Sequence, residues 1–331
     1  MVNVAINGFG RIGRQTFRAA FQRKLVKIIA INDLTDTKTL AHLLKYDTAY
    51  GTWPVEIDFD ENNLIVAGKK VPVFAEKDPT RLPWKKLKVD VALECTGRFT
   101  SVEGGEMHIT AGARKVIISA PAKGGVPTYV RGVNCDKVKN EKIKIINNAS
   151  CTTNCIAPIM AVLQDHFGVE KAMMSTVHGY TADQNLQDGP HRDLRRARAA
   201  AENIVPTTTG AAVATTEAIP ELQGIFDGLA IRVPVPTVSL SDVTAILMKE
   251  VTVDEINDAF VKASKEDRFK GILTTTKELL VSSDFIGNTH SAIIDLPLTN
   301  VVGQTMVKVI GWYDNETGYS NRLIEMAEKF S

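Results

Sequence analysis

The residues best suited to chemistry in this sequence gather around Cys151, in the run Asn148-Ala149-Ser150-Cys151-Thr152-Thr153-Asn154-Cys155. A strand-like apolar segment, 143–147, precedes the run, and a helix-like segment, 156–167, follows it. At such a junction a cysteine lies beside the unpaired N–H groups and the positive dipole end of the helix, which favour the reactive thiolate. The neighbouring hydroxyls can cap the helix or hold an anion. Two interpretations remain open at this point: a nucleophile beside an anion site, or a small buried apolar side chain.

The amino-terminal residues indicate a dinucleotide-binding turn. A short apolar strand, 2–7, leads into Gly8-Phe9-Gly10-Arg11-Ile12-Gly13, and a helical pattern follows. In a G-x-G-x-x-G turn, Gly8 permits the tight bend, Gly10 lets a pyrophosphate approach the backbone, and Gly13 lets helix and strand pack closely. The phosphates of a dinucleotide then meet the N–H groups at the start of the helix.

An acidic residue identifies the preferred dinucleotide. Asp33 closely follows the second strand-like segment, 27–31, and lies 20 positions after Gly13. A carboxylate at this distance accepts hydrogen bonds from the adenosine ribose and repels a 2′-phosphate. No arginine stands in the segment 32–36, where an NADP site would need one. The sequence therefore predicts NAD as the cofactor.

Composition fits an enzyme of more than one domain. The chain has 331 residues and a net charge of +1, which gives no electrostatic reason to expect a nucleic-acid or membrane partner. Its apolar runs are strand-sized, and no export signal is visible at the amino terminus. The cysteines lack the spacing of a metal site, so we expect free thiols, no metal and a cytoplasmic location.

The distribution of strand-like segments predicts an α/β protein. Before Cys151, strand-like and helical segments alternate, which is typical of a doubly wound parallel sheet, with an antiparallel meander near 55–73. After it, longer and partly alternating strands indicate a mixed or antiparallel sheet in an α+β domain. Thr252 and Glu255 form a capping box before a helix, and 318–330 has helical spacing of apolar residues. We expect a dinucleotide-binding domain at 1–150 and a second domain at 151–314.

Several polar residues of the second half could serve a site. His178 lies near the end of a predicted strand, where it could act as general base or ion-pair partner for Cys151, although a lone histidine is usually structural. Arg232 stands within an apolar strand, so it needs a carboxylate or a bound phosphate as partner. The arginine-rich run 194–200 can be a solvated surface. The hydroxyl- and glycine-rich run 206–212 suits an anion.

Five ordered motifs carry a family resemblance. They are Ile6-Asn7-Gly8-Phe9-Gly10-Arg11-Ile12-Gly13-Arg14, Ala149-Ser150-Cys151-Thr152-Thr153-Asn154, Leu194-Arg195-Arg196-Ala197-Arg198, Pro206-Thr207-Thr208-Thr209-Gly210 and Trp312-Tyr313-Asp314-Asn315-Glu316. Over essentially its whole length the chain resembles the NAD-dependent, phosphorylating glyceraldehyde-3-phosphate dehydrogenases. The resemblance implies a Rossmann domain at 1–150, a catalytic domain on a mixed sheet at 151–314, and a carboxyl-terminal helix, 315–331, that returns to the first domain. It also implies a homotetramer in which a loop, about 181–203, reaches a neighbouring subunit's cofactor.

The resemblance also assigns roles. It implies that Cys151 is the nucleophile and His178 its catalytic partner. The implied cofactor contacts are Gly8, Gly10, Arg11, Ile12, Gly13, Asp33, Lys77, Ser119 and Asn315. The implied contacts to the substrate phosphate and to inorganic phosphate are Ser150, Thr152, Thr181, Arg196, Thr209, Gly210 and Arg232. Gly189-Pro190 resembles the form of the loop found in NAD-specific members.

The implied reaction converts glyceraldehyde 3-phosphate, inorganic phosphate and NAD to 1,3-bisphosphoglycerate and NADH, through a hemithioacetal and a thioester on Cys151. One alternative is an erythrose-4-phosphate dehydrogenase, whose members tend to lose the threonine and glycine of the phosphate site; Thr181, Thr209 and Gly210 are present here. The other alternative is a dinucleotide-binding regulatory protein without activity, which the presence of both Cys151 and His178 disfavours.

The assignment of Asp33 can be tested by changing it to glycine. Asp33→Gly should weaken NAD binding, because a hydrogen bond to a charged group contributes about 1.5–3 kcal/mol. NADP should improve, since its 2′-phosphate no longer meets a carboxylate, but no full reversal is expected without an arginine. The measurement is kcat/KM for both cofactors. A wild-type preference for NADP, or an unchanged ratio in the variant, would contradict the assignment.

Overall fold

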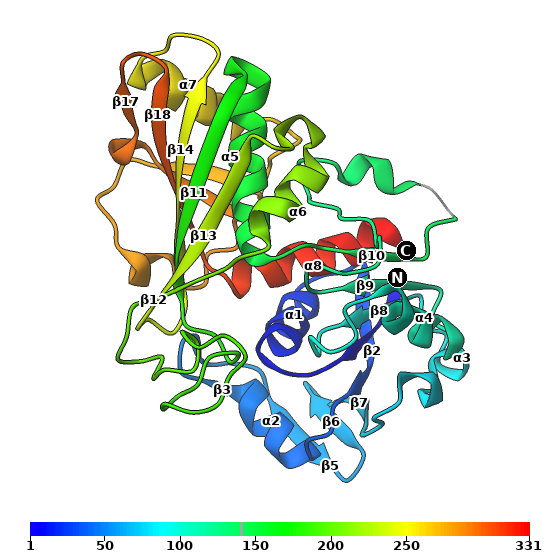
Figure 1. Ribbon diagram of the computed structural model, residues 1–331. Helices are drawn as coiled ribbons and strands as arrows, with labels where there is room; N and C mark the ends of the chain where they lie inside the picture. The colour runs from blue at the N-terminus through cyan, green and yellow to red at the C-terminus, as the bar shows by residue number, and fades with distance from the viewer. Residues whose placement is uncertain (140–141) are drawn as a thin grey trace. The chain divides into compact units, whose positions relative to one another are not determined.

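The chain forms two compact units in the computed structural model, which describes residues 1–139 and 142–331. The first unit holds residues 1–129, 136–149 and 320–331, and the second holds 130–135 and 150–319 (Figure 1). No helix in the described part of the chain is both long and apolar enough to cross a membrane.

The described residues of the first unit build an eight-stranded sheet in the order β10-β9-β8-β1-β2-β7-β6-β5. Its strands are β1 (Val2–Asn7), β2 (Val26–Asn32), β5 (Ile57–Asp60), β6 (Asn63–Val66), β7 (Lys69–Phe74), β8 (Val91–Glu94), β9 (Lys115–Ile118) and β10 (Ile145–Asn147). Pairing is parallel from β10 to β7, which confirms the predicted parallel sheet. The antiparallel meander also forms, and it continues this sheet beyond β7.

Helices flank this sheet and bury its apolar residues (Figure 1). They are α1 (Arg11–Phe21), α2 (Thr37–Lys45), α3 (Trp84–Leu87), α4 (Val102–Thr110) and, from residue 320 on, α8 (Thr317–Phe330), beside a short ribbon of β3 (Tyr46–Asp47) and β4 (Gly51–Thr52). Trp84 is fully buried in a cluster with Ala5 of β1 and Val116 of β9. Burial of this kind contributes about 1.5–3 kcal/mol for each large apolar side chain.

Helix α8 belongs to the first unit although it comes from the other end of the sequence. Its residues Leu323, Ile324 and Met326 are fully buried, as the predicted helical spacing requires. Arg23, which follows α1, pairs with Glu325 at 2.7 Å and with Glu328 at 3.1 Å. Apolar burial and these half-buried ion pairs therefore fix the last helix on the first unit.

The second unit contains a mixed sheet, as predicted, with the described order β12-β13-β11-β14-β18-β16-β15 and with β17 paired to β18. Its strands are β11 (Val169–Gly179), β12 (Val205–Thr207), β13 (Phe226–Val233), β14 (Ser239–Leu247), β15 (Leu273–Thr276), β16 (Ala292–Asp295), β17 (Asn300–Val302) and β18 (Met306–Tyr313). β11 pairs with β13 and β15 with β16 in parallel, whereas β11–β14 and β14–β18 are antiparallel.

The helices of this unit are α5 (Cys151–Phe167), α6 (Ala211–Ala218) and α7 (Val253–Ala263). Helix α5 is buried along most of its length and packs on one face of the sheet. Gly311 of β18 makes this possible, because a Cβ there would lie 2.6 Å from Ile159 of α5. The predicted capping box of α7 is present: the Thr252 hydroxyl accepts from the Glu255 N–H, and the Glu255 carboxylate accepts from the Thr252 N–H.

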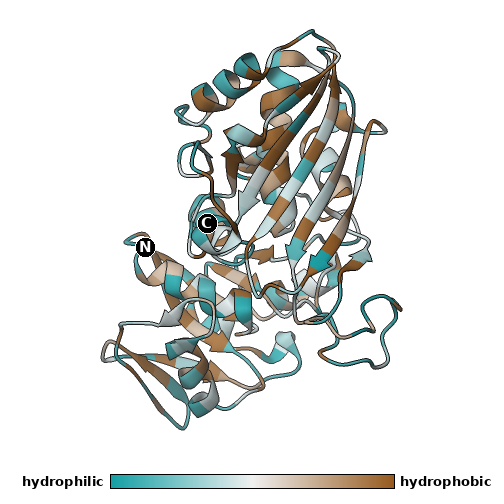
Figure 2. Ribbon diagram, turned by 90° about the vertical axis from the view of Figure 1, so that its left-hand side faces the viewer, coloured by the Kyte–Doolittle hydropathy of each residue, from teal (hydrophilic) through white to brown (hydrophobic). Residues whose placement is uncertain are grey.

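The other face of the sheet carries exposed apolar side chains. Along β14, buried and half-buried residues alternate, as expected of a strand with different surroundings on its faces. Figure 2 shows brown and teal bands following one another along the strands. Met173 of β11, Leu229 of β13 and Met306 of β18 are 66%, 42% and 43% exposed.

Candidate active site

Cys151 and His178 meet within the second unit. Ser150 caps α5, since its hydroxyl accepts from the Thr153 N–H at 3.0 Å, and this makes Cys151 the first residue of the helix. His178 lies near the end of β11, with its Nε2 3.4 Å from the Cys151 Sγ. The His178 Nδ1–H donates to the Gly179 carbonyl at 2.6 Å, so Nε2 is left to accept a proton from the thiol.

Arg232 stands next to this pair because of the strand register. The parallel pairing of β11 and β13 sets His178 opposite Arg232. The Arg232 Nη1 lies 3.3 Å from the His178 Nδ1 and donates to the Thr181 hydroxyl at 2.8 Å. The apolar strand therefore carries a guanidinium beside an imidazole and a hydroxyl, a combination that fits an anionic group of a substrate.

Burial and charge determine the protonation of the pair. Burial raises the pKa of the Cys151 thiol, and the Arg232 charge partly offsets this. Burial first and Arg232 second lower the pKa of His178 to about 3, so the imidazole is neutral at neutral pH. The thiolate expected from the helix start is thus opposed by burial, and the resting pair is a thiol beside a neutral imidazole. Such an imidazole can act as a base.

Cys155 differs from Cys151 in its exposure and its partners. It is fully buried one turn along α5, and its Sγ faces the Gly311 carbonyl at 3.8 Å. Burial raises its pKa strongly. Cys151 is partly exposed and has the histidine partner. Of these two thiols, Cys151 has the surroundings of a nucleophile and Cys155 those of a core residue.

Tyr313 supports the pair and was not predicted as a site residue. Its hydroxyl lies 2.9 Å from the Thr152 hydroxyl and 2.8 Å from the Thr176 hydroxyl, and its ring meets the ring of His178 edge to face. Burial raises its pKa, so it stays a phenol that links α5 to β11. The motif around Asn315 contains Tyr313, but only the strand pairing reveals what it contacts.

A chain of polar contacts leads from Arg232 to the predicted phosphate residues. The Thr181 hydroxyl donates to the Asp183 carboxylate, which also pairs with Arg196. Burial tends to raise the pKa of Asp183, but the Thr181 hydrogen bond and the arginine charges lower it overall. The Arg196 guanidinium also donates to the Thr207 hydroxyl at 2.9 Å and to the Thr208 carbonyl at 3.1 Å.

These last contacts end at the start of α6. Gly210 is the residue before the helix, it has no side chain with which to cap the helix, and Thr209 stands just before it. The Thr209 hydroxyl accepts from the Ala211 N–H at 3.2 Å. A helix start next to a guanidinium is a favourable surrounding for an anion. Asp183 was missed from the sequence, where nothing distinguishes it from other loop acids.

Asn315 is held in a fixed orientation. Its side chain is buried, and its Oδ1 accepts from the Ser239 hydroxyl at 3.0 Å. That hydroxyl in turn accepts from the Gly179 N–H at 3.2 Å. Ser239 therefore ties the amide of Asn315 to the strand that carries His178. Ser239 too was missed, because a serine at a strand start has no distinctive sequence pattern.

The first unit contains the predicted dinucleotide turn. Gly8 has a φ of +92°, and a Cβ on it would lie 2.7 Å from the Thr96 nitrogen. A Cβ on Gly13 would lie 2.2 Å from the Gly8 carbonyl oxygen. Beside Gly10 a Cβ would meet no atom within 4 Å, and no side chain caps the N–H groups at the start of α1. The turn thus combines close backbone packing with open space at a helix start, which fits a bound pyrophosphate.

The remaining predicted cofactor residues of this unit follow the carboxyl ends of its parallel strands. Asp33 follows β2, Lys77 comes after β7, and Ser119 follows β9. The Asp33 carboxylate accepts from the Phe9 N–H at 2.7 Å, so it lies against the glycine turn. The side chain of Arg11 pairs with Asp47, which leaves its backbone as the part that can meet a phosphate. Ligands of open α/β sheets bind at this edge.

The described residues also bear on metal binding. No group of three or more His, Cys, Asp and Glu side chains that could hold a metal ion is found in the described part of the chain.

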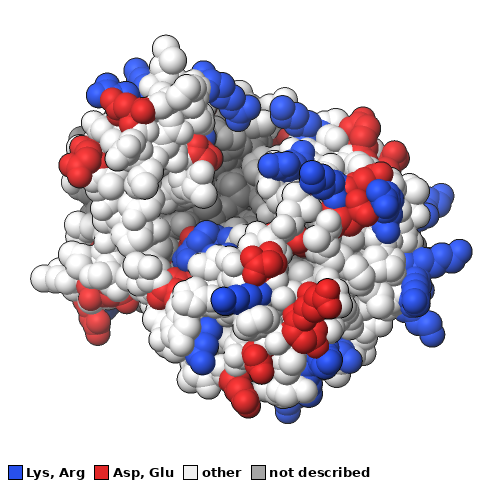
Figure 3. Space-filling view, turned by 90° about the horizontal axis from the view of Figure 1, so that it is seen from below, with Lys and Arg blue, Asp and Glu red and all other residues white. Residues whose placement is uncertain are grey.

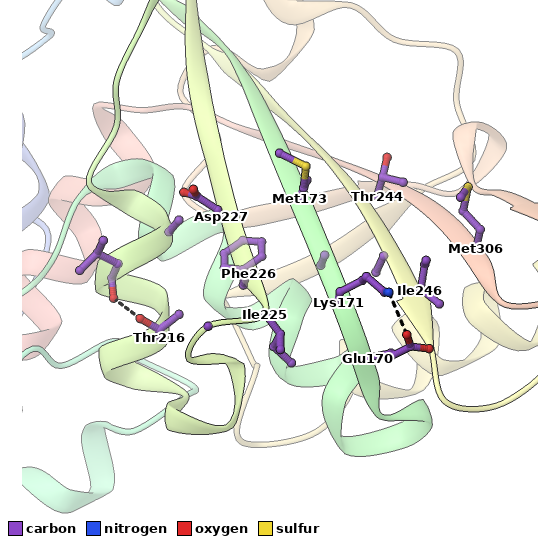
Figure 4. A pocket seen from close by; sticks show the side chains of 15 residues that line it. Glu170, Lys171, Met173, Thr216, Ile225, Phe226, Asp227, Thr244, Ile246 and Met306 are labelled. Atoms are coloured by element: carbon purple, nitrogen blue, oxygen red, sulfur yellow. Dashed lines mark hydrogen bonds and ion pairs between the residues drawn. The ribbon is translucent and has the colours of Figure 1, made fainter.

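A hollow of about 990 Å³ lies on the open sheet face, with Met173, Phe226, Ile246 and Met306 in its wall (Figure 4). Its lining includes neither Cys151 nor His178.

Comparisons with known proteins agree with this geometry. Residues 2–102 match the sequence model of the glyceraldehyde 3-phosphate dehydrogenase NAD binding domain, and residues 150–315 match that of the C-terminal domain. A glyceraldehyde-3-phosphate dehydrogenase of Thermotoga maritima is 55% identical over 99% of this chain and 98% of its own. The Geobacillus stearothermophilus enzyme of the same name is 54% identical over 98% and 97%.

The influence of Arg232 on the thiol gives a prediction. Arg232→Gln should raise the pKa of Cys151, because it removes the positive charge that partly offsets burial. The rate of Cys151 alkylation at neutral pH should fall, and its pH profile should move to higher pH. Arg268→Gln is the matched control, since Arg268 belongs to the same unit but pairs with Asp165. An unchanged profile in Arg232→Gln, or an equal change in both variants, would contradict the prediction.

Proposed function

This chain belongs to the glyceraldehyde-3-phosphate dehydrogenase family, and on that premise we propose that it oxidises glyceraldehyde 3-phosphate with NAD and inorganic phosphate to 1,3-bisphosphoglycerate. The observation that carries the proposal is the Cys151 thiol 3.4 Å from a neutral His178, with Arg232 beside them. These groups supply a nucleophile, a base and an anion partner within one unit. The chain is accordingly an NAD-dependent oxidoreductase.

The proposed reaction begins with the aldehyde. The Cys151 sulfur bonds to the aldehyde carbon, and the thiol proton passes through the His178 Nε2 to the former carbonyl oxygen, which gives a hemithioacetal. The backbone N–H of Cys151 and the imidazole are the donors that stabilise negative charge on that oxygen. His178 then accepts the hydroxyl proton while the carbon loses hydride, and a thioester remains on Cys151. NAD supplies the hydride acceptor.

Inorganic phosphate completes the proposed cycle. A phosphate oxygen attacks the thioester carbon, the carbon–sulfur bond breaks, and Cys151 is regenerated. We assign Thr181, Arg232 and Arg196 to the phosphate that the substrate already carries. Ser150, Thr152, Thr209 and Gly210 are assigned to the attacking phosphate. In support, the contact chain from Arg232 to the uncapped start of α6 offers donors over a continuous stretch of the second unit.

We assign cofactor binding to residues 1–150 together with the helix 315–331, and the covalent chemistry to 151–314. The glycine turn would hold the pyrophosphate at Gly10, Arg11 and Ile12, and Asp33 would accept from the ribose. Lys77, Ser119 and Asn315 would complete the cofactor contacts, with the Asn315 amide orienting the nicotinamide amide. The open space at Gly10 and the Asp33 contact to the turn support this assignment.

An erythrose-4-phosphate dehydrogenase activity is the nearest alternative. The two activities differ in whether phosphate or water attacks the thioester, so the phosphate site discriminates between them. Thr181 donates from within the Arg232 contact chain, and Thr209 and Gly210 stand at the uncapped helix start. This arrangement favours the phosphorylating activity. A reducing compartment such as the cytoplasm suits it, because Cys151 must remain a thiol.

Replacing the proposed nucleophile tests the proposed function. Cys151→Ser should abolish turnover with glyceraldehyde 3-phosphate, because a hydroxyl is far less acidic than a thiol of pKa near 8.5. NAD binding should persist. Cys155→Ser is the matched control and should keep its activity, since Cys155 is buried and has no histidine partner.

The wild type should also show a burst of NADH without phosphate and continuous turnover with it. Wild-type activity in Cys151→Ser would refute the mechanism. A steady rate that does not respond to phosphate would refute the phosphorylating reaction and favour hydrolysis of the thioester.

We further propose a homotetramer. The open face of the second sheet exposes Met173 and Met306, and the loop between β11 and β12 exposes Leu186 and Leu194 at 78% and 81%. Met173 and Met306 line one hollow, and exposed apolar surface of this kind is typical of an interface between subunits. The charged residues give no comparable signal, since positive and negative side chains are interspersed on the face shown in Figure 3.

The sheet face provides the test of this assembly. The wild type should be a tetramer, whereas Met173→Glu should form smaller species, because the substitution introduces a charge into a contact that excludes water. Leu25→Glu is the matched control: Leu25 is 64% exposed but belongs to the first unit. Sedimentation velocity measures the species. A monomeric wild type, or a Met173→Glu variant that stays tetrameric, would contradict the proposal.

A further inference from the structure

A buried carboxylate at the end of β8 has no part in the chemistry proposed above. Glu94 is 1% exposed, yet within the described residues its oxygens accept several hydrogen bonds. The Asn7 Nδ2 donates at 2.5 Å, the His108 Nε2 donates at 3.1 Å, and the Thr96 N–H donates at 2.7 Å. The Thr96 hydroxyl donates as well. A buried charge is tolerated only with this degree of satisfaction.

The direction of the His108 hydrogen bond is fixed from outside. The indole N–H of Trp84 can only donate, and it donates to the His108 Nδ1 at 3.1 Å. The Nδ1 is therefore without a proton, and the ring must carry its proton on Nε2, which faces Glu94. Both Trp84 and His108 are fully buried, so water cannot replace either partner.

The direction of the Asn7 hydrogen bond is fixed in the same way. The backbone N–H of Glu76 donates to the Asn32 Oδ1, and the Asn32 Nδ2 donates to the Glu76 carbonyl, both at 2.9 Å. This pair of bonds sets the amide of Asn32, whose Nδ2 also donates to the Asn7 Oδ1 at 2.7 Å. The Asn7 amide can then present only its Nδ2 to Glu94.

Only a group that accepts on both oxygens fits the position of Glu94. The Asn7 Nδ2 and the His108 Nε2 donate to one oxygen of Glu94, and the Thr96 N–H donates to the other. The orientation of Asn7 and of His108 is fixed by their other partners. A glutamine of the same size would turn its own N–H groups toward one of these donors. The Asn7 amide cannot turn around, because the Glu76 N–H and carbonyl fix the amide of Asn32, which fixes that of Asn7. The His108 tautomer cannot change either, because the Trp84 indole N–H can only donate.

Three members of this network immediately precede a residue of the cofactor edge. Asn7 is followed by Gly8, Asn32 by Asp33, and Glu76 by Lys77. Thr96, held by Glu94, is the residue that a Cβ on Gly8 would strike, so the β8 loop and the glycine turn are in direct contact. The network thus connects the ends of β1, β2 and β8 under the turn.

We propose that Glu94 is a positioning residue of the dinucleotide site, whose carboxylate holds Asn7 and Thr96 and thereby fixes the glycine turn before the cofactor arrives. This inference rests on the cofactor contacts proposed for Gly8 to Gly13 and Asp33. It assigns to Glu94 no contact with the cofactor and no part in the covalent chemistry. A turn fixed in advance binds more tightly, because less conformational freedom is lost on binding.

The experiment compares NAD binding and catalysis in the full-length wild type and in Glu94→Gln. Titration calorimetry should show the Kd for NAD rising about tenfold, as expected for the loss of a hydrogen bond to a charged group. The KM for NAD should rise in parallel. At saturating NAD, kcat should stay within about twofold of wild type, as should the rate of Cys151 alkylation, because a positioning role acts through binding.

Leu64→Ala is the matched control. It removes buried apolar volume from β6 of the same unit, but it takes away none of the donors to Glu94, so the Kd for NAD should stay within about twofold. Thr96→Val is a second variant in case Glu94→Gln does not fold. It deletes only the hydroxyl donor and should raise the Kd by a smaller factor, about threefold.

An unchanged Kd in folded Glu94→Gln, or in Thr96→Val where the first does not fold, would overturn the inference. So would an equal rise of the Kd in Leu64→Ala, since that would mark a general effect of core damage. A wild type that does not oxidise glyceraldehyde 3-phosphate would instead refute the proposed function. The two failures are thus distinguishable.

Discussion

The register between β11 and β13 is the constraint on which the second unit's chemistry depends. Parallel pairing sets His178 opposite Arg232, and α5 brings Cys151 to the imidazole from outside the sheet. Because side chains alternate between the faces of a strand, a slip of one residue would move His178 or Arg232 to the opposite face. The hydrogen bonds that the Arg232 guanidinium donates to the Gly179 carbonyl and the Thr181 hydroxyl resist such a slip.

The same register creates an electrostatic conflict that a substrate can relieve. Arg232 lowers the pKa of the imidazole that must accept a proton, while it also lowers the pKa of the thiol that must lose one. A phosphate group beside Arg232 would compensate its charge, and the pKa of His178 would then rise. The base would become stronger when the proposed substrate is bound, so the anion site and the base are parts of one electrostatic system.

Local patterns predicted much of this structure. The strand–turn–helix of residues 2–21, the capping box of α7 and the spacing of α8 depend on residues close in sequence, and all are present. Boundaries were less accurate: the strand expected over 143–147 begins at Ile145, and the helix expected over 156–167 begins at Cys151, because Ser150 caps it there. Tyr313, Ser239 and Glu94 could not be found, since their partners are distant in sequence and are set by strand order and register.

Helix α8 has a consequence for the way this protein is made. Its Leu323 and Ile324 fill part of the first unit's core, and Glu325 and Glu328 supply the ion-pair partners of Arg23. During synthesis these residues emerge only after the entire second unit, so the nascent amino-terminal sheet must persist with apolar surface uncovered. Closing so long a loop costs little extra entropy but delays completion of the unit. We therefore expect the nascent chain to need protection from aggregation until its last helix has docked.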